Sequence, residues 1–186
     1  MSEEPVLQNS CGTCIACCYA LAFNAEEGLK KKAGDMCPNC TGTGCRIYET
    51  RFKLCRLFLC AWRKLPMLGE EWRPDNSGVM MIEVEGDDIP QAYRAAGVGI
   101  EFLMLKDETI ITRPGFSEYV GSLMSRRVAV FMGMIGGPKT IINQYLEPLV
   151  AAKDLPGLTA MLLHIFNMHL EARRLGIAGP DHKPAG

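Results

Sequence analysis

The pattern of hydrophobic and polar positions divides this chain of 186 residues into two unlike parts. From residue 75 onward, apolar runs alternate with amphipathic stretches, which is the pattern of a small sheet with helices packed against it. Runs rich in β-branched and apolar residues predict strands at 79–84, 100–105, 109–112 and 127–135. Helical spacing predicts helices at 117–126, from 138 or 139 to about 146, and at 158–175.

Two local signals add detail to this second part. The polar residues at 106–108 predict a turn that joins strands 100–105 and 109–112 into a hairpin. Ser117, which follows Pro114 and Gly115, is the expected N-cap of the helix at 117–126.

The first 74 residues show no such regular alternation. Residues 46–62 predict one helix or two short ones, and the Pro-, Gly- and Asn-rich stretch 62–77 indicates a connector. We therefore expect an α+β protein in two units that pack as one compact body. Residues 1–74 would form a cysteine-rich metal- or cluster-binding module. Residues 75–186 would form a scaffold with a small antiparallel or mixed sheet and C-terminal helices.

Composition and charge exclude several classes of protein. Hydrophobic residues make up 48% of the chain and charged residues 22%, as in an ordinary soluble globule. The net charge of −1 argues against a nucleic-acid binder, and no apolar run is long enough to predict a membrane span. Residues 1–64 nevertheless carry nine Lys and Arg against six Asp and Glu, so this segment has a net charge of +3.

That basic segment also contains every cysteine of the chain. The nine are Cys11, Cys14, Cys17, Cys18, Cys37, Cys40, Cys45, Cys55 and Cys60. Disulfides fit poorly, because the count is odd, two cysteines are adjacent, and the acidic N-terminus does not resemble a signal peptide. We therefore expect a cytoplasmic protein whose thiols bind a metal or a cluster.

The spacing of the cysteines is compatible with two kinds of centre. The opening Cys-x-x-Cys-x-x-Cys run is typical of iron–sulfur proteins, in which three such thiols and a distant fourth hold a [4Fe–4S] cluster. The pair Cys37 and Cys40, followed by glycines, is typical of a zinc knuckle. Adjacent Cys17 and Cys18 point in different directions and could serve two different centres. Nine thiols suffice for one or two centres.

The motif from Cys11 to Cys60 resembles the bacterial CxxCxxCC family of the YkgJ type, which is described as a zinc- or iron-chelating domain. The resemblance covers the first third of the chain and includes the arginines at 51 and 56. It implies that the cofactor-binding positions are Cys11, Cys14, Cys17, Cys18, Cys37, Cys45 and Cys55. Cys40 and Cys60 are further candidate metal ligands that fit the family pattern less closely.

These observations favour an iron–sulfur protein with an electron-transfer or accessory redox role. The alternative is a zinc-binding structural module that mediates protein–protein interaction. Either reading implies a protein partner, which would be a redox partner or a client enzyme. No catalytic set of side chains is evident in the sequence, and any enzymatic activity would be of the iron–sulfur oxidoreductase type.

Overall fold

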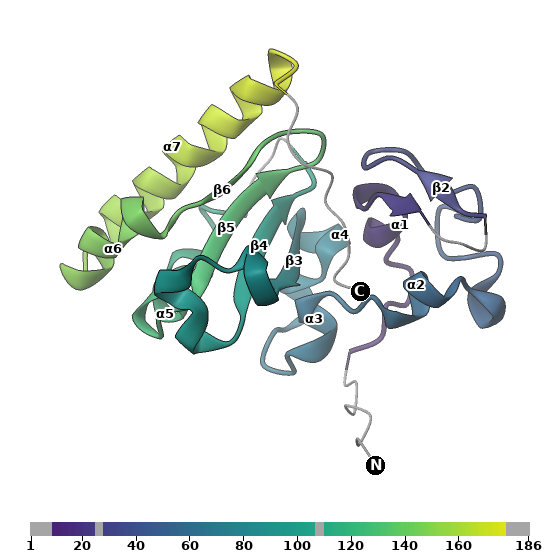
Figure 1. Cartoon of the computed structure of the whole chain (residues 1–186), viewed down its shortest axis with the longest axis horizontal. Helices are drawn as coiled ribbons and strands as arrows, with labels where there is room; N and C mark the ends of the chain where they lie inside the picture. The colour runs from purple at the N-terminus through teal and green to yellow at the C-terminus, as the bar shows by residue number, and fades with distance from the viewer. Residues whose placement is uncertain (1–8, 25–27, 107–109, 178–186) are drawn as a thin grey trace.

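The computed structural model describes residues 9–24, 28–106 and 110–177. Its centre is a four-stranded mixed sheet in the order β3-β4-β5-β6 (Figure 1). The strands are β3 (Val79–Val84), β4 (Gly99–Met104), β5 (Ala129–Met134) and β6 (Lys139–Ile141). β4 pairs antiparallel with β3 and parallel with β5, and β5 pairs antiparallel with β6. The combination of helices with a mixed sheet agrees with the predicted α+β class.

Three helices pack against this sheet and against one another (Figure 1). They are α5 (Phe116–Ser125), α6 (Asn143–Ala151) and α7 (Leu155–Arg174). Phe102 of β4 meets Phe116 of α5 edge to face, with ring centroids 5.3 Å apart. Every residue of β4 and β5 is buried, so these two central strands form the hydrophobic middle of the protein.

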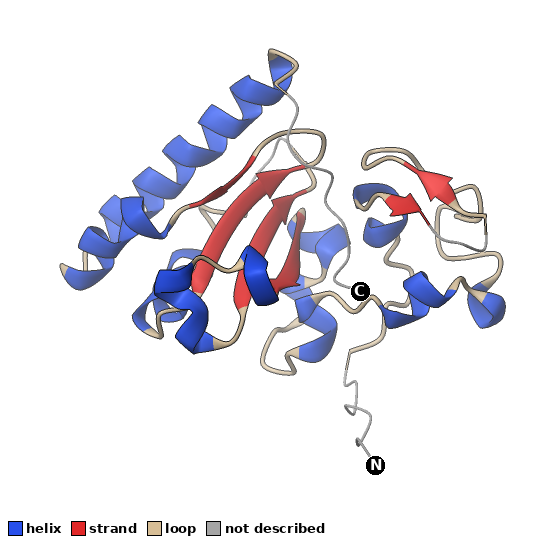
Figure 2. Ribbon diagram, viewed as in Figure 1, coloured by secondary structure: helices blue, strands red, loops and turns tan. Residues whose placement is uncertain are grey.

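The N-terminal part of the chain consists of short elements joined by loops (Figure 2). They are α1 (Ala16–Ala20), β1 (Phe23–Asn24), β2 (Lys30–Lys31), the 3-10 turn η1 (Tyr48–Thr50), α2 (Lys53–Leu57), α3 (Ala61–Lys64), η2 (Glu70–Trp72) and α4 (Pro74–Ser77). Two further 3-10 turns, η3 (Gly86–Asp88) and η4 (Gln91–Ala96), lie between β3 and β4. Helices α3 and α4 contact the edge strand β3 and so join the cysteine-rich segment to the sheet.

Trp62 in α3 is the largest side chain at this junction. It is 1% exposed, and its indole Nε1 donates a hydrogen bond to the carbonyl oxygen of Gly69 at 3.0 Å. One continuous buried cluster contains Trp62, Leu21 and Phe23 of the N-terminal segment together with Phe102 and Met132 of the sheet. The cysteine-rich segment is therefore packed onto the sheet through a shared core.

Most predicted elements are confirmed, but the hairpin is wrong. The strands predicted at 79–84, 100–105 and 127–135 and the helices at 117–126 and 158–175 are all present within a few residues. Strand 100–105 uses both of its edges, for β3 and β5, so neither edge is left for residues 109–112. Ile110 and Ile111 lie instead in a turn, where their side chains are buried; residues 107–109 fall outside the described part of the chain.

Two helix starts also differ from the prediction. Residues 139–141 form β6 and not a helix, because Gly136 adopts a positive φ of 69° and the chain reverses to pair Lys139 with Gly133. Ser117 lies inside α5, whose N-cap is Gly115, and its hydroxyl contacts that of Thr159 at 2.7 Å. Hairpin pairing with β5 in the first case and packing against α7 in the second outweigh the expected helix starts.

Asn143, at the start of α6, should be one of the most important polar residues for stability. It is fully buried; its Oδ1 accepts from the Val130 N–H at 2.7 Å, and its Nδ2 donates to the Val128 carbonyl at 2.9 Å. Asn143→Ala leaves both backbone groups unpaired in the core and should lower the free energy of unfolding by about 2–4 kcal/mol. Urea denaturation measures this change.

The matched control is Asn167→Ala, which alters an exposed position of α7 and should shift stability by no more than about 0.5 kcal/mol. Equal stability of the two variants would contradict the role assigned to Asn143.

Candidate metal centre

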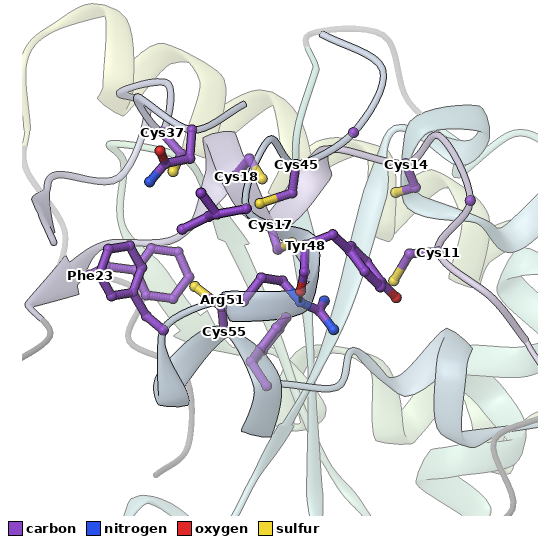
Figure 3. Close-up of a pocket in the computed structure, with 16 residues that line it drawn as sticks. Cys11, Cys14, Cys17, Cys18, Phe23, Cys37, Cys45, Tyr48, Arg51 and Cys55 are labelled. Atoms are coloured by element: carbon purple, nitrogen blue, oxygen red, sulfur yellow. Dashed lines mark hydrogen bonds between the residues drawn. The ribbon is translucent and has the colours of Figure 1, made fainter. Parts of the chain in front are cut away.

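Seven cysteines line one cavity in the N-terminal segment (Figure 3). They are Cys11, Cys14, Cys17, Cys18, Cys37, Cys45 and Cys55. The cavity measures about 710 Å³, a volume that includes solvent space at its mouth. These seven are the positions marked by the family resemblance, and they come from four separate stretches of the chain.

Backbone hydrogen bonds shape the first of these stretches and connect it to the second. The Cys14 N–H donates to the Cys11 carbonyl at 2.8 Å, which forms a tight turn just before α1. The Cys37 N–H donates to the Cys18 carbonyl at 2.9 Å and so holds Cys37 beside the end of the first cysteine run. The sulfur positions are therefore set by backbone contacts between loops and short helices.

The second cysteine pair opens a compact knuckle. The Cys40 N–H donates to the Cys37 carbonyl at 3.0 Å, and Cys40 forms an isolated antiparallel bridge with Cys45. Gly42 adopts a positive φ of 88°, and its N–H lies 3.5 Å from the Cys40 Sγ. Burial raises the pKa of the Cys40 thiol, and the Gly42 amide opposes this shift only in part.

Aromatic and cationic groups complete the cavity. Phe23, Phe52 and Phe58 supply an apolar wall. The Arg51 guanidinium lies 3.8 Å from the centroid of the Tyr48 ring, and its Nε donates to the Tyr48 carbonyl at 2.9 Å. Positive charge is thus fixed at the rim of a cavity whose interior is sulfur and hydrocarbon.

The adjacent thiols Cys17 and Cys18 differ strongly in acidity. The pKa of Cys18 is lowered to about 6, chiefly by a hydrogen bond from Cys17. Burial opposes this shift. A hydrogen bond from Cys40 and the positive charges of Lys31 and Arg51 add to it. The pKa of Cys17 is raised, because its thiol proton is engaged with Cys18 and because its side chain is buried. Cys18 is therefore the thiolate of the pair.

The two remaining cysteines lie outside the cavity lining. The Cys40 thiol donates a hydrogen bond to Cys18, so Cys40 lies close to the cavity although it does not line it. Cys60 is 8% exposed at the N-cap of α3, and burial raises its pKa to about 11. A buried, protonated thiol of this kind is typical of a structural cysteine.

The chemistry of the cavity fits a thiophilic metal. All nine cysteines are free, and thiolates are the preferred ligands of zinc and of iron–sulfur clusters. The side chains do not converge as they stand: among the described residues, no three Cys, His, Asp or Glu side chains surround a common point that could hold an ion. Binding would therefore require rotation of cysteine side chains that already line one space.

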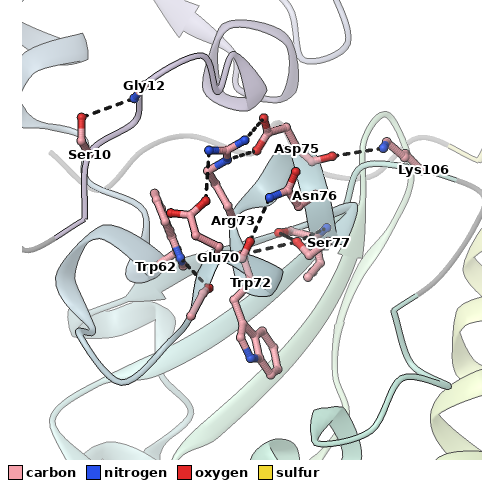
Figure 4. A network of polar contacts seen from close by, with 12 residues as sticks. Ser10, Gly12, Trp62, Glu70, Trp72, Arg73, Asp75, Asn76, Ser77 and Lys106 are labelled. Carbon is pink, nitrogen blue, oxygen red and sulfur yellow. Dashed lines mark hydrogen bonds and ion pairs between the residues drawn. The ribbon is translucent and has the colours of Figure 1, made fainter.

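The residue pattern did not predict a role for Asp75, which lies outside the cysteine motif. Burial and, to a lesser extent, the charge of Asp75 raise the pKa of Cys14. The Asp75 carboxylate forms an ion pair with Arg73, whose Nε lies 2.7 Å from Oδ1 (Figure 4). Residue 75 belongs to the stretch that the sequence indicates as a connector.

Comparison with protein-family models, curated proteins and solved structures finds no match to this chain. Within the described residues, no helix has the length and apolar character needed to cross a membrane.

Alkylation should distinguish the thiols of the reduced, metal-free protein. At pH 7 a thiol with a pKa of about 6 is about nine-tenths ionised, whereas one with a pKa of about 11 is ionised in about one molecule in ten thousand. Limiting iodoacetamide should therefore modify Cys18 well before Cys60, as peptide fragmentation by mass spectrometry would show. Labelling of Cys60 at the same rate as Cys18 would contradict this order.

Proposed function

We propose that this protein binds an iron–sulfur cluster through the thiols that line the cavity and that it has an electron-transfer or accessory redox role. The single observation that carries this proposal is the gathering of seven cysteines around one space. A structural zinc ion and a [4Fe–4S] cluster each take four ligands, so seven thiols exceed what one centre of either kind requires. The bound group would supply a redox couple, which zinc lacks.

The residues around the thiols suit this role. Phe23, Phe52 and Phe58 keep water away from one side of the cavity, and the polarity and solvent access of the surroundings tune the potential of a cluster. The positive charges of Lys31 and Arg51 act on Cys18 and offset negative charge that accumulates on thiolates. The cationic side chains favour the thiolate form of Cys18, and the aromatic side chains limit solvent access to the cavity.

The motif resemblance to the CxxCxxCC family, with its zinc- or iron-chelating description, points to the same chemistry. We further propose that residues 1–74 act as a cysteine-rich binding module on the scaffold of 75–186, in a cytoplasmic protein that serves a protein partner. The exposed aromatic ring of Tyr48 and the exposed side chain of Leu57 lie on the elements around the cavity and offer contact area to such a partner.

A zinc-binding structural module is the second candidate, and a specific observation favours it. The turn from Cys37 to Cys45 has the bridge, the left-handed glycine and the amide-to-sulfur approach of a zinc knuckle. In this case the metal would stabilise the N-terminal segment, whose elements are short, and partner binding would belong to its surface.

The bound group should be identified by elemental analysis and a visible spectrum. Protein purified without air, from cells supplied with both iron and zinc, should be brown and contain about four iron and four sulfide per centre. Addition of dithionite should change the spectrum reversibly. Colourless protein with stoichiometric zinc would reject the redox role in favour of the structural one, and protein without metal would reject both.

Two serine substitutions should separate a ligand from a structural cysteine. Cys45→Ser removes a cavity thiol and should abolish metal loading of the centre that it serves. Cys60→Ser alters a buried thiol outside the cavity and should leave most of the metal in place, although it places a hydroxyl in the core and should cost about 1–3 kcal/mol of stability. Metal content per folded protein measures both effects. Complete loss of metal in Cys60→Ser would contradict the assignment.

A further inference from the structure

Charge is distributed unevenly over the described residues. Residues 9–24 carry no charged side chain, whereas residues 28–64 carry nine Lys and Arg against only two Asp and Glu. The other four acids of residues 1–64, at positions 3, 4, 26 and 27, fall outside the described part of the chain. The described residues after 64 carry ten Lys and Arg against twelve Asp and Glu. Positive charge is therefore concentrated on the segment that surrounds the cavity.

One wall of the cavity has an inner and an outer face. It consists of residues 45–58, which contain η1 and α2, and we call it the basic wall. Half of its residues line the cavity, namely Cys45, Ile47, Tyr48, Arg51, Phe52, Cys55 and Phe58. Between these lie exposed residues that do not line the cavity, namely Arg46, Glu49, Thr50, Lys53, Arg56 and Leu57. The basic wall is therefore a single layer of chain between the thiols and the solvent.

The basic wall carries four cations and one acid. Arg46, Lys53 and Arg56 are exposed, and none of them lines the cavity, so their charges meet the solvent. The Arg51 guanidinium lies 3.8 Å from the centroid of the Tyr48 ring (Figure 3). The Arg56 Nη1 donates a hydrogen bond to the Arg51 carbonyl, which holds a second guanidinium against the wall. The cations thus form one surface on the outside of the cavity.

Apolar surface accompanies these charges. Tyr48 is 45% exposed and Leu57 is 58% exposed. Leu57 also lines a small groove with Glu83 and Glu85, so the basic surface ends where α2 meets the acidic edge of β3. Tyrosine and arginine are enriched at protein–protein interfaces, where an apolar centre lies within a polar rim. The composition of the basic wall is therefore that of a surface for docking another protein.

The basic wall lies where a partner can reach it. Figure 1 shows α2 on the outer side of the cysteine-rich segment, with the sheet between α2 and α6. Cys55 lies within α2, and Cys45 directly precedes Arg46. A protein in contact with the outer face would therefore be separated from the cavity thiols by one short helix and one turn. Electron exchange between proteins weakens with distance, so a wall of this thickness favours it.

We propose that the outer face of the basic wall is the docking surface for a redox protein whose own contact surface is acidic. The inference rests on the proposed function in one respect, because it takes the partner to be a redox protein. A surface with charge of one sign steers partners of opposite charge and rejects partners of like charge. Nucleic acid suits the protein less well, since the described residues after 64 carry net negative charge that repels phosphates.

Binding of the full chain to redox proteins of opposite charge tests the proposal. The probes are an acidic [2Fe–2S] ferredoxin, the basic protein cytochrome c and a short DNA duplex. The ferredoxin should bind, and its Kd should rise at least about tenfold between ionic strengths of about 0.01 and 0.15 M, because salt screens the charges. Cytochrome c should not bind under either condition. Biolayer interferometry measures all three interactions.

Charge reversal locates the surface. The double variant Arg46→Glu with Lys53→Glu changes two exposed side chains that do not line the cavity, and it should weaken ferredoxin binding by about tenfold or more at low salt. The matched control, Arg126→Glu with Lys153→Glu, changes the net charge equally on exposed residues after α5 and α6. It should change the Kd by no more than about threefold, because these positions lie on the far side of the sheet.

A charge-conserving variant separates charge from fold. Arg46→Lys with Lys53→Arg should bind ferredoxin as the wild type does, because both positive charges remain. Equal weakening in this variant or in the matched control would overturn the inference, and so would the absence of salt-dependent binding to ferredoxin. Tighter binding of the DNA duplex, lost in the charge-reversal variant, would assign the surface to nucleic acid instead.

The iron and sulfide content of the same preparations tests the proposed function separately, because none of these variants alters a thiol. Protein with full iron content that fails to bind ferredoxin would overturn only the docking surface. Charge-dependent binding by protein that contains no iron or sulfide would overturn the redox role and support the acidic docking surface.

Discussion

Crowded thiols place an electrostatic constraint on the N-terminal segment. Seven cysteines line one cavity, and each ionised sulfur makes ionisation of the next less favourable. In the Cys17–Cys18 pair a hydrogen bond from Cys17 lowers the pKa of Cys18, while that bond, burial and the neighbouring charge raise the pKa of Cys17. Several sulfurs can carry negative charge together only if positive charge lies among them. Arg51 and Lys31 supply some at the rim, and a metal would supply it at the centre.

The N-terminal segment has little regular structure of its own. Its helices and strands are too short to be stable alone, and they are held by backbone bonds between loops and by a buried cluster around Trp62. A centre that cross-links loops contributes stability that a small core lacks. Metal binding and folding of this segment are therefore expected to be coupled, whichever metal is bound.

The sheet and its helices provide a rigid base for this segment. β4 and β5 are buried along their whole length, and α3 and α4 lie against the neighbouring strand. Helix α3 contacts β3, and its Trp62 and Arg63 follow the last cysteine of the motif. The same two residues hold the beginning of the motif, because Asn9 donates from Nδ2 to the Trp62 carbonyl at 2.7 Å and accepts from the Arg63 Nε at 3.1 Å. The two ends of the motif are thus positioned by the part of the chain that contains no cysteine.

Composition and short-range periodicity of the sequence are enough to identify the soft donors, their restriction to one segment, and the longest apolar elements, such as β3, β5 and α7. The hairpin of β6 with β5 is local, since Lys139 pairs with Gly133, but the residue types at 139–141 did not distinguish it from a helix start. The burial of Ile110 and Ile111 depends on the tertiary structure, because β3 and β5 occupy both edges of β4 and leave no edge for a further strand. A strand needs a free edge, and a local pattern carries no information about which edges are free.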